Sequence, residues 1–245
     1  MIAEIIIIGD EILYGLVKEE NSYIIIRQLT SMGIFVSRVV IIRDDEKEIM
    51  NAVKSALERK ADLIVTTGGL GPTEDDKTLD TIAKLLGKEI IYNEEIVKKI
   101  IHCFKGKPPQ AAFKMARVIK DAKLYPSPLG LVPGQVLKVD KSYIIILPGP
   151  PREVETLLKS ILEDLSGELK AKHKCIKTIY VKAKEAELAS LLLDVIKIYG
   201  VYAKAIITQK GDKGLPIEIL SFDDDKERCE QKIREVIEYI QKHLS

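Results

Sequence analysis

The chain has 245 residues, enough for one large domain or two modest ones. Hydrophobic residues make up 46% of it and charged residues 31%, a composition that excludes a mainly disordered chain. The formal net charge of +1 argues against a broad basic surface for nucleic acid, and no apolar run reaches membrane-spanning length. We therefore expect neither nucleic acid nor a membrane as a partner.

The cysteines and the N-terminus indicate the compartment. Cys103, Cys175 and Cys229 lie far apart and form no CxxC pair, and an odd count does not indicate a disulfide framework. The apolar start, MIAEIIIIGDE, lacks the basic beginning and long apolar core of a signal peptide. These features predict a reducing, cytoplasmic setting.

Short apolar runs alternate with helical periods through most of the first 168 residues. The expected strands and helices are, in order, strand 3–9, helix 22–33, strand 36–42, helix 46–59, strand 62–68, helix 78–87, strand 143–149 and helix 152–165. Such alternation gives parallel strands with helices on both faces, and near-continuous Ile and Val runs fit strands that are covered on both sides. We expect a three-layer α/β domain around a mostly parallel sheet.

The segment from about 105 to 134 is rich in proline and glycine, as in KGKPPQ and LYPSPLGLVPGQ. A long irregular stretch inside a compact domain is often functional, although a plain connecting loop explains it as well. Lys114 and Arg117 lie within it. They are candidates for pairing with phosphates, and solvated surface charges are the commoner case.

A domain boundary is expected near 166–176. Beyond it the pattern is strand 177–183, helix 185–199, strands 202–211 and 216–222, and helix 225–243. This order predicts a second, smaller α+β domain over 176–245, after a first domain over 1–168. The second domain shows no cluster of chemistry-bearing residues, so we interpret it as a structural or oligomerisation module.

The stretch TTGGLGPTEDDKT, residues 66–78, joins a predicted strand to a predicted helix. Strand 62–68 brings Gly68, Gly69 and Gly71 to the carboxyl edge of the sheet, where ligands bind in open α/β folds. Glycines let the backbone approach a ligand closely, and the N-terminus of the next helix suits an anion. Neither G-x-G-x-x-G nor a P-loop motif is present, which leaves both the dinucleotide fingerprint and the P-loop unsupported.

Acidic residues follow this turn at once, and two explanations stay open. Thr73-x-x-Asp76 resembles a capping box, and acids in a first helical turn favour the helix dipole. Alternatively, one of these carboxylates, such as Asp76, holds a divalent cation or accepts a hydrogen bond from a ligand hydroxyl or amine. A metal would cancel the repulsion between carboxylate and phosphate.

Two further acidic loops follow the first two strands. Gly9-Asp10-Glu11 ends the first strand and Asp44-Asp45-Glu46 follows the second. Since neighbouring parallel strands end close together, we expect three acidic loops near one glycine turn. Such a cluster suits Mg²⁺ in an oxygen-ligand site that keeps several waters, whereas each loop alone is more often an N-cap or a solvated loop.

These residues together resemble a known family. GDEILYG with a following NS, TTGGLGPTEDDKT, PGQV and LPGPPREVE are similar to motifs of the CinA (competence-damage-inducible protein A) family. The resemblance implies a molybdopterin-binding fold over residues 1–168 and the small middle domain of that family in the rest. Full-length bacterial members carry a further C-terminal amidase domain. This chain ends before that domain, so the resemblance implies no amidase activity.

The resemblance further implies metal-dependent hydrolysis of ADP-ribose or a similar nucleotide, with Mg²⁺, Mn²⁺ or Co²⁺. It gives Asp76 and Asp44 catalytic roles and makes Asp10, Glu11 and Asp76 metal ligands. The implied contacts to substrate and phosphate are Gly68, Gly69, Gly71, Thr67, Asn21 and Gly149. A homo-oligomer, dimer or trimer, is expected because relatives of this fold commonly assemble.

The sequence also departs from the family pattern. It has Glu19-Glu20-Asn21 where relatives often have D-T-N, and Gly130-Leu131-Val132-Pro133-Gly134 where they often have G-T-A-P-G. The missing threonine hydroxyl puts the substrate in doubt more than the fold. The alternatives are molybdopterin adenylylation with ATP, and a non-catalytic module that binds a nucleotide or molybdopterin.

Overall fold

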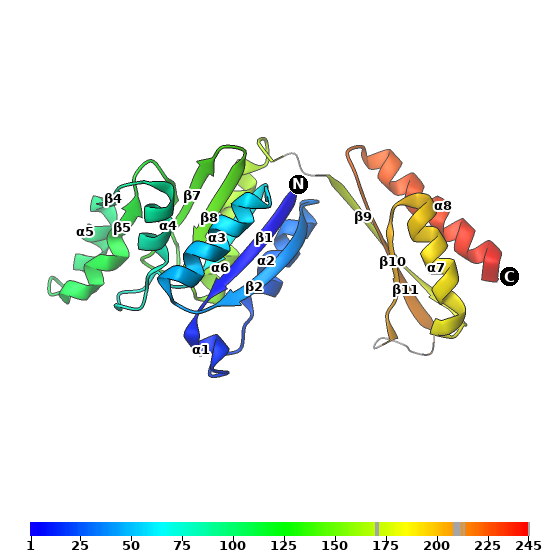
Figure 1. Cartoon of the computed structure of the whole chain (residues 1–245), viewed down its shortest axis with the longest axis horizontal. Helices are drawn as coiled ribbons and strands as arrows, with labels where there is room; N and C mark the ends of the chain where they lie inside the picture. The colour runs from blue at the N-terminus through cyan, green and yellow to red at the C-terminus, as the bar shows by residue number, and fades with distance from the viewer. Residues whose placement is uncertain (170–171, 208–211, 213, 245) are drawn as a thin grey trace. The chain divides into compact units, whose positions relative to one another are not determined.

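The computed structural model describes residues 1–169, 172–207, 212 and 214–244. The chain divides into two compact units (Figure 1). The larger comprises Met1–Thr30 and Ile34–Lys170, and the smaller comprises Ser31–Gly33 and Ala171–Ser245.

The larger unit is built on a six-stranded sheet in the order β2-β1-β3-β8-β7-β6. The strands are β2 (Phe35–Ile42), β1 (Ile2–Ile8), β3 (Leu63–Thr67), β8 (Ser142–Leu147), β7 (Gly134–Val139) and β6 (Lys123–Tyr125). The first four strands in this order run parallel, and β7 and β6 join antiparallel at one edge. The parallel strands therefore all end at the same edge of the sheet.

Helices cover both faces of this sheet, with α3 (Glu46–Glu58) and α4 (Thr78–Leu86) on one and α2 (Asn21–Ser31) and α6 (Pro151–Leu165) on the other (Figure 1). Local signals set their limits. The carboxylate of Asp45 accepts the N–H groups of Lys47 and Glu48 at the start of α3, and α4 ends at Gly87, whose φ is 61°. The predicted three-layer α/β fold with a mostly parallel sheet is confirmed.

The segment that was expected to be irregular carries several short elements. A 3₁₀ helix (Gln110–Ala116), β5 (Arg117–Ile119) and β6 lie within 105–134, and β5 pairs with β4 (Ile90–Tyr92). The helix α5 (Glu94–Cys103), which the pattern did not predict, packs against the 3₁₀ helix in a small separate core. The expectation was wrong because contacts between these pieces, rather than any local periodicity, hold them.

The smaller unit has the predicted order strand-helix-strand-strand-helix. It contains β9 (His173–Val181), α7 (Glu185–Tyr199), β10 (Tyr202–Ala205), β11 (Leu215–Asp223) and α8 (Lys226–Leu244). The antiparallel sheet β10-β11-β9 packs its apolar side chains against both helices. Residues 208–211 of the predicted strand 202–211 lie outside the described part of the chain. No helix within the described residues has the length and apolar character needed to span a membrane.

Candidate functional site

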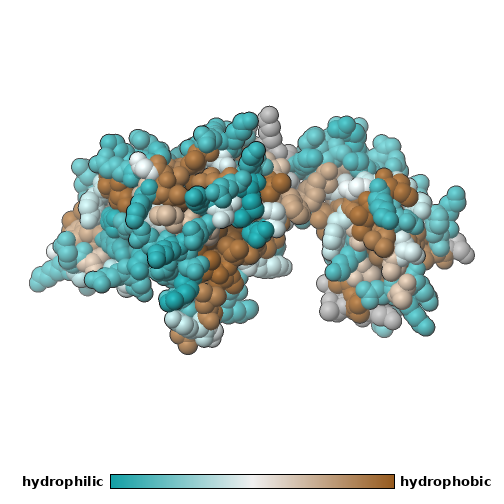
Figure 2. All heavy atoms as spheres, viewed as in Figure 1, coloured by the Kyte–Doolittle hydropathy of each residue, from teal (hydrophilic) through white to brown (hydrophobic). Residues whose placement is uncertain are grey.

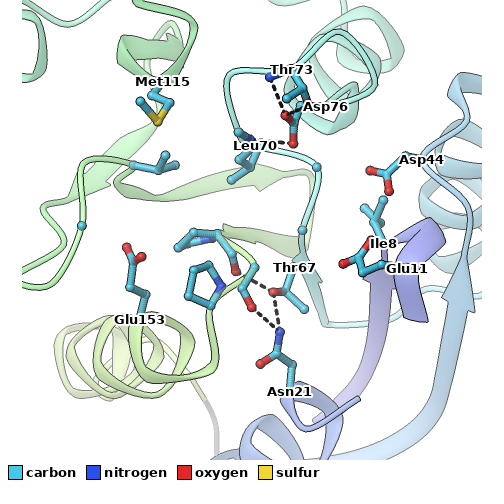
Figure 3. Close-up of a pocket in the computed structure, with 18 of the residues that line it drawn as sticks. Ile8, Glu11, Asn21, Asp44, Thr67, Leu70, Thr73, Asp76, Met115 and Glu153 are labelled. Carbon is cyan, nitrogen blue, oxygen red and sulfur yellow. Dashed lines mark hydrogen bonds between the residues drawn. The ribbon is translucent and has the colours of Figure 1, made fainter. Parts of the chain in front are cut away.

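A pocket of about 610 Å³ opens where β1, β3 and β8 end (Figure 3). Its walls come from the loops that follow these parallel strands, together with the segment around Leu131. Nine of the ten residues predicted for the site line it: Glu11, Asn21, Asp44, Thr67, Gly68, Gly69, Gly71, Asp76 and Gly149. The chain thus brings the glycine turn and the acidic loops together, as expected for one edge of a parallel sheet.

The glycine turn packs too tightly for side chains. Gly68 has φ 101°, and a Cβ there would lie 2.0 Å from the carbonyl oxygen of Ile8. Gly69 has φ 64°, and a Cβ there would lie 2.2 Å from Oγ1 of Thr78. Both positions combine a left-handed backbone with a close approach, which only glycine tolerates without strain. The turn is therefore held against β1 and α4.

The side chain of Asp76 accepts hydrogen bonds from the glycine turn and stabilises it. Its Oδ1 accepts the N–H of Gly71 at 2.7 Å, and its Oδ2 accepts the N–H and the hydroxyl of Thr73. The capping-box interpretation of Thr73 and Asp76 is wrong, because α4 begins only at Thr78 and Thr73 donates to Asp76 rather than accepting. Both oxygens of this carboxylate already hold the loop in place.

Asp44 is a pocket carboxylate whose pKa is raised. Burial, the largest cause, together with the negative charges of Glu11, Asp76 and Asp10, raises the pKa of Asp44 to about 6, against a hydrogen bond from the N–H of Asp10 that lowers it. That N–H lies 3.1 Å from Oδ2. In Figure 3, Asp44 and Glu11 reach the same side of the pocket from different loops. The acidic loops thus carry an excess of negative charge.

Asp10 is the predicted site residue that does not line the pocket. Its Oδ1 lies 3.0 Å from Nε of Arg43, the residue that immediately precedes Asp44. This ion pair engages the carboxylate of Asp10 outside the pocket lining. Asp10 contacts the pocket through its backbone, whose N–H donates a hydrogen bond to the carboxylate of Asp44.

Asn21 joins the ends of β3 and β8. Its Nδ2 donates to Oγ1 of Thr67 at 3.2 Å and to the carbonyl oxygen of Gly149 at 2.8 Å, and the Thr67 hydroxyl donates to the carbonyl of Pro148. Asn21 is 7% exposed, and its buried Oδ1 has no hydrogen-bond partner within the described residues. These bonds fix the floor of the pocket (Figure 3).

Comparison with known proteins identifies the family of this chain. The family model described as a probable molybdopterin binding domain matches residues 4–167. The crystal structure of the protein CinA, of unknown function, from Thermoplasma acidophilum is 36% identical with a TM-score of 0.62, and the match covers 67% of this chain and 97% of that one. The chain belongs to the CinA family. Its larger unit is a molybdopterin-binding-like domain.

Relatives of known sequence agree with this family assignment. Protein PH0439 from Pyrococcus horikoshii is 35% identical over 98% of this CinA-family chain and 95% of its own length. The CinA-like protein of Thermotoga maritima is 33% identical over 99% of this chain. This chain spans 59% of the length of that relative.

Sequence reasoning did not assign two acidic residues of this CinA-family pocket, Asp75 and Glu153. Glu153, in the first turn of α6, lines the wall that faces Asp44 and Glu11 (Figure 3). The stretch LPGPPREVE carries part of the family resemblance, and of its residues only Gly149 was predicted to contact the ligand. An acid in the first turn of the helix that follows β8, at the same sheet edge as Asp10 and Asp44, was the signal that could have identified Glu153.

The charged side chains described in the lining of this CinA-family pocket are all acidic. Its lining includes the carboxylates of Glu11, Asp44, Asp75, Asp76 and Glu153, and none of the described residues that line it is Lys, Arg or His. The cationic candidates from the sequence are engaged elsewhere, since Lys114 donates to the carbonyl of Thr73 and Arg117 pairs with Asp80. An anionic ligand would need a positive partner that the lining side chains do not supply.

Proposed function

We propose that the pocket binds a pyrophosphate-containing nucleotide such as ADP-ribose together with a divalent cation, and hydrolyses the pyrophosphate. The observation that carries this proposal is a glycine turn that shares its pocket with carboxylates, while no Lys, Arg or His of the described chain lines that pocket. A volume of about 610 Å³ is within the range of small-molecule sites. A phosphate group would enter such a site only with its charge neutralised.

The chemistry of the available donors fits a hard cation. Asp44 and Glu11 offer oxygen ligands on one side of the pocket, and a cation there would offset the repulsion from nearby acids that, after burial, raises the pKa of Asp44. Within the described residues, no three carboxylate, His or Cys side chains are grouped closely enough to enclose an ion. Water and phosphate oxygens would therefore complete the shell, as Mg²⁺ sites commonly allow.

A divalent cation bound there, whether Mg²⁺, Mn²⁺ or Co²⁺, would supply neutralisation of the charge that develops on the phosphate oxygens. The backbone of the turn adds donors, because the N–H groups of Gly69 and Leu70 have no hydrogen-bond partner in the described part of the chain. Such preorganised N–H groups stabilise developing charge at phosphorus.

In this proposal Asp44 accepts the proton of the attacking water. With a pKa of about 6, raised by burial, it is largely ionised at neutral pH and still more basic than an exposed Asp. In the reaction, the water oxygen bonds to phosphorus and the bridging P–O bond breaks. ADP-ribose and water would then give AMP and ribose 5-phosphate.

A product assay tests the proposal. We expect AMP to form from ADP-ribose with Mg²⁺, Mn²⁺ or Co²⁺ and not with a chelator, and we expect Asp44→Asn to lower the rate by about 10²-fold or more. Glu74→Gln is the matched control, because Glu74 is exposed in the same turn and does not line the pocket. Absence of AMP with every cation would contradict hydrolysis.

A second candidate function is supported by the family match over residues 4–167, which points to molybdopterin as the ligand. The chain would then bind the pterin alone or transfer AMP to it from ATP with release of pyrophosphate. Binding of molybdopterin without turnover would favour a non-catalytic module, and release of pyrophosphate from ATP only with the pterin would favour adenylylation.

We also propose that the chain is a cytoplasmic homo-oligomer, a dimer or trimer. Apolar side chains are exposed on α1 (Asp10–Leu13) and just after it, up to 76% for Leu16 (Figure 2). Large exposed apolar patches commonly mark interfaces, and the three cysteines are free thiols, which fits a reducing compartment. Light scattering of the wild type and of Leu16→Ser would test assembly, with a monomeric wild type as the contrary result.

A further inference from the structure

We infer that Glu153 accepts hydrogen bonds from the ribose hydroxyls of the nucleotide and so determines specificity for ribose. This inference rests on the proposed nucleotide function. It concerns a residue across the pocket from the acids proposed to neutralise the phosphates.

Glu153 lies opposite the proposed phosphate position. Asp44 and Glu11 occupy one side of the pocket, and Glu153 extends toward the pocket from α6 on the other side (Figure 3). The glycine turn also lines this pocket. In a nucleotide the ribose is joined directly to the phosphates, so a ligand with its phosphates at the turn has its sugar next to one of these walls.

The carboxylate of Glu153 is oriented by a dedicated loop. The hydroxyl of Ser127 donates to Oε2 at 2.8 Å, and Ser127, only 8% exposed, accepts the N–H groups of Gly130 and Leu129. A Cβ on Gly130 would lie 2.1 Å from Oε2 of Glu153. The loop 127–130 is therefore shaped around this carboxylate.

Glu153 is also left with acceptor capacity. Within the described residues it forms no ion pair, and its Oε1 has no hydrogen-bond partner, whereas both oxygens of Asp76 are engaged and Asp10 is paired with Arg43. An ionised carboxylate only accepts hydrogen bonds. Vicinal ribose hydroxyls are donors that a carboxylate recognises in nucleotide sites, and they are the donors of the ligand nearest to its phosphates.

Calorimetric titration with ADP and with 2′,3′-dideoxy-ADP, both with Mg²⁺, tests this inference without requiring turnover. We expect the wild type to bind ADP about tenfold or more tightly than the dideoxy nucleotide, since a hydrogen bond to a charged group is worth about that factor. Glu153→Gln should keep the fold and lose most of this discrimination by weakening ADP binding alone. Glu155→Gln, an exposed residue of the same helix outside the pocket lining, is the matched control and should behave as wild type.

Gly130→Ala is a second, independent variant. It leaves Glu153 present but displaces its carboxylate, so it should also lose discrimination while its thermal midpoint stays near that of the wild type. Equal affinity of the wild type for both nucleotides, or full discrimination in Glu153→Gln, would overturn the inference and leave the nucleotide function standing. Failure of the wild type to bind either nucleotide would overturn the proposed function and this inference with it.

Discussion

The backbone N–H of Gly71 donates to the carboxylate of Asp76 at 2.7 Å, and the same carboxylate fills the space where a Gly71 side chain would lie. Two further donors from Thr73 converge on it. An Asn side chain offers one acceptor oxygen to these three donors, so Asp76→Asn should lower the free energy of unfolding by about 1–3 kcal/mol, measured in urea.

Glu74→Gln is the control for this substitution, because Glu74 is exposed and forms none of these bonds. Loss of activity in Asp76→Asn is expected together with the loss of stability, since the turn that carries the free N–H groups would move. An unchanged urea midpoint with abolished turnover would show instead that Asp76 acts in the chemistry and does not brace the loop.

Gly68 and Gly87 allow the cost of a close approach to be separated from the cost of backbone strain. Both have positive φ, but a Cβ at Gly87 would meet no atom within 4 Å, whereas at Gly68 it would lie 2.0 Å from the Ile8 carbonyl. Gly87→Ala should cost about 1 kcal/mol, and Gly68→Ala about 3 kcal/mol or more, because the ends of β1 and β3 must separate. Equal thermal midpoints of the two variants would contradict this packing.

The pKa of Asp44, raised to about 6 chiefly by burial, makes the stability of the fold depend on pH. The folded chain holds this proton more tightly than the unfolded chain does, so the associated stability is complete below about pH 4 and is lost as pH rises through 6. Asp44→Asn removes the titration and still accepts the N–H of Asp10. Relative to wild type it should gain on the order of 1 kcal/mol at pH 8, allowing for partial solvent screening, with no gain near pH 4. Parallel stability curves for the two proteins would contradict it.

The parallel core of the fold was predictable because each of its strands is a run of Ile and Val, and each helix has a clear apolar stripe. The convergence of Glu11, Asp44 and the glycine turn followed from the same topology. Which side chains hydrogen-bond or form ion pairs with one another could not be predicted, because these contacts join residues that are distant in the sequence. Asp10, after β1, forms an ion pair with Arg43, after β2, and Ser127 orients Glu153 from 26 positions away in the chain. No local pattern carries such information.

Cation binding should stabilise the larger unit through Asp44. A ligand that binds only the folded state adds about 2.7 kcal/mol at 100 times its dissociation constant, which for a unit of this size raises the thermal midpoint by about 5–10 °C. We expect Mn²⁺ to give such a rise in the wild type at pH 7.5 and in Glu74→Gln. The rise should be smaller at pH 5, where Asp44 with its pKa of about 6 is mostly protonated and the proton competes with the cation. Asp44→Asn should lose most of it at both pH values. An equal rise in Asp44→Asn and in the wild type would place cation binding elsewhere and remove the basis for a metal in this pocket.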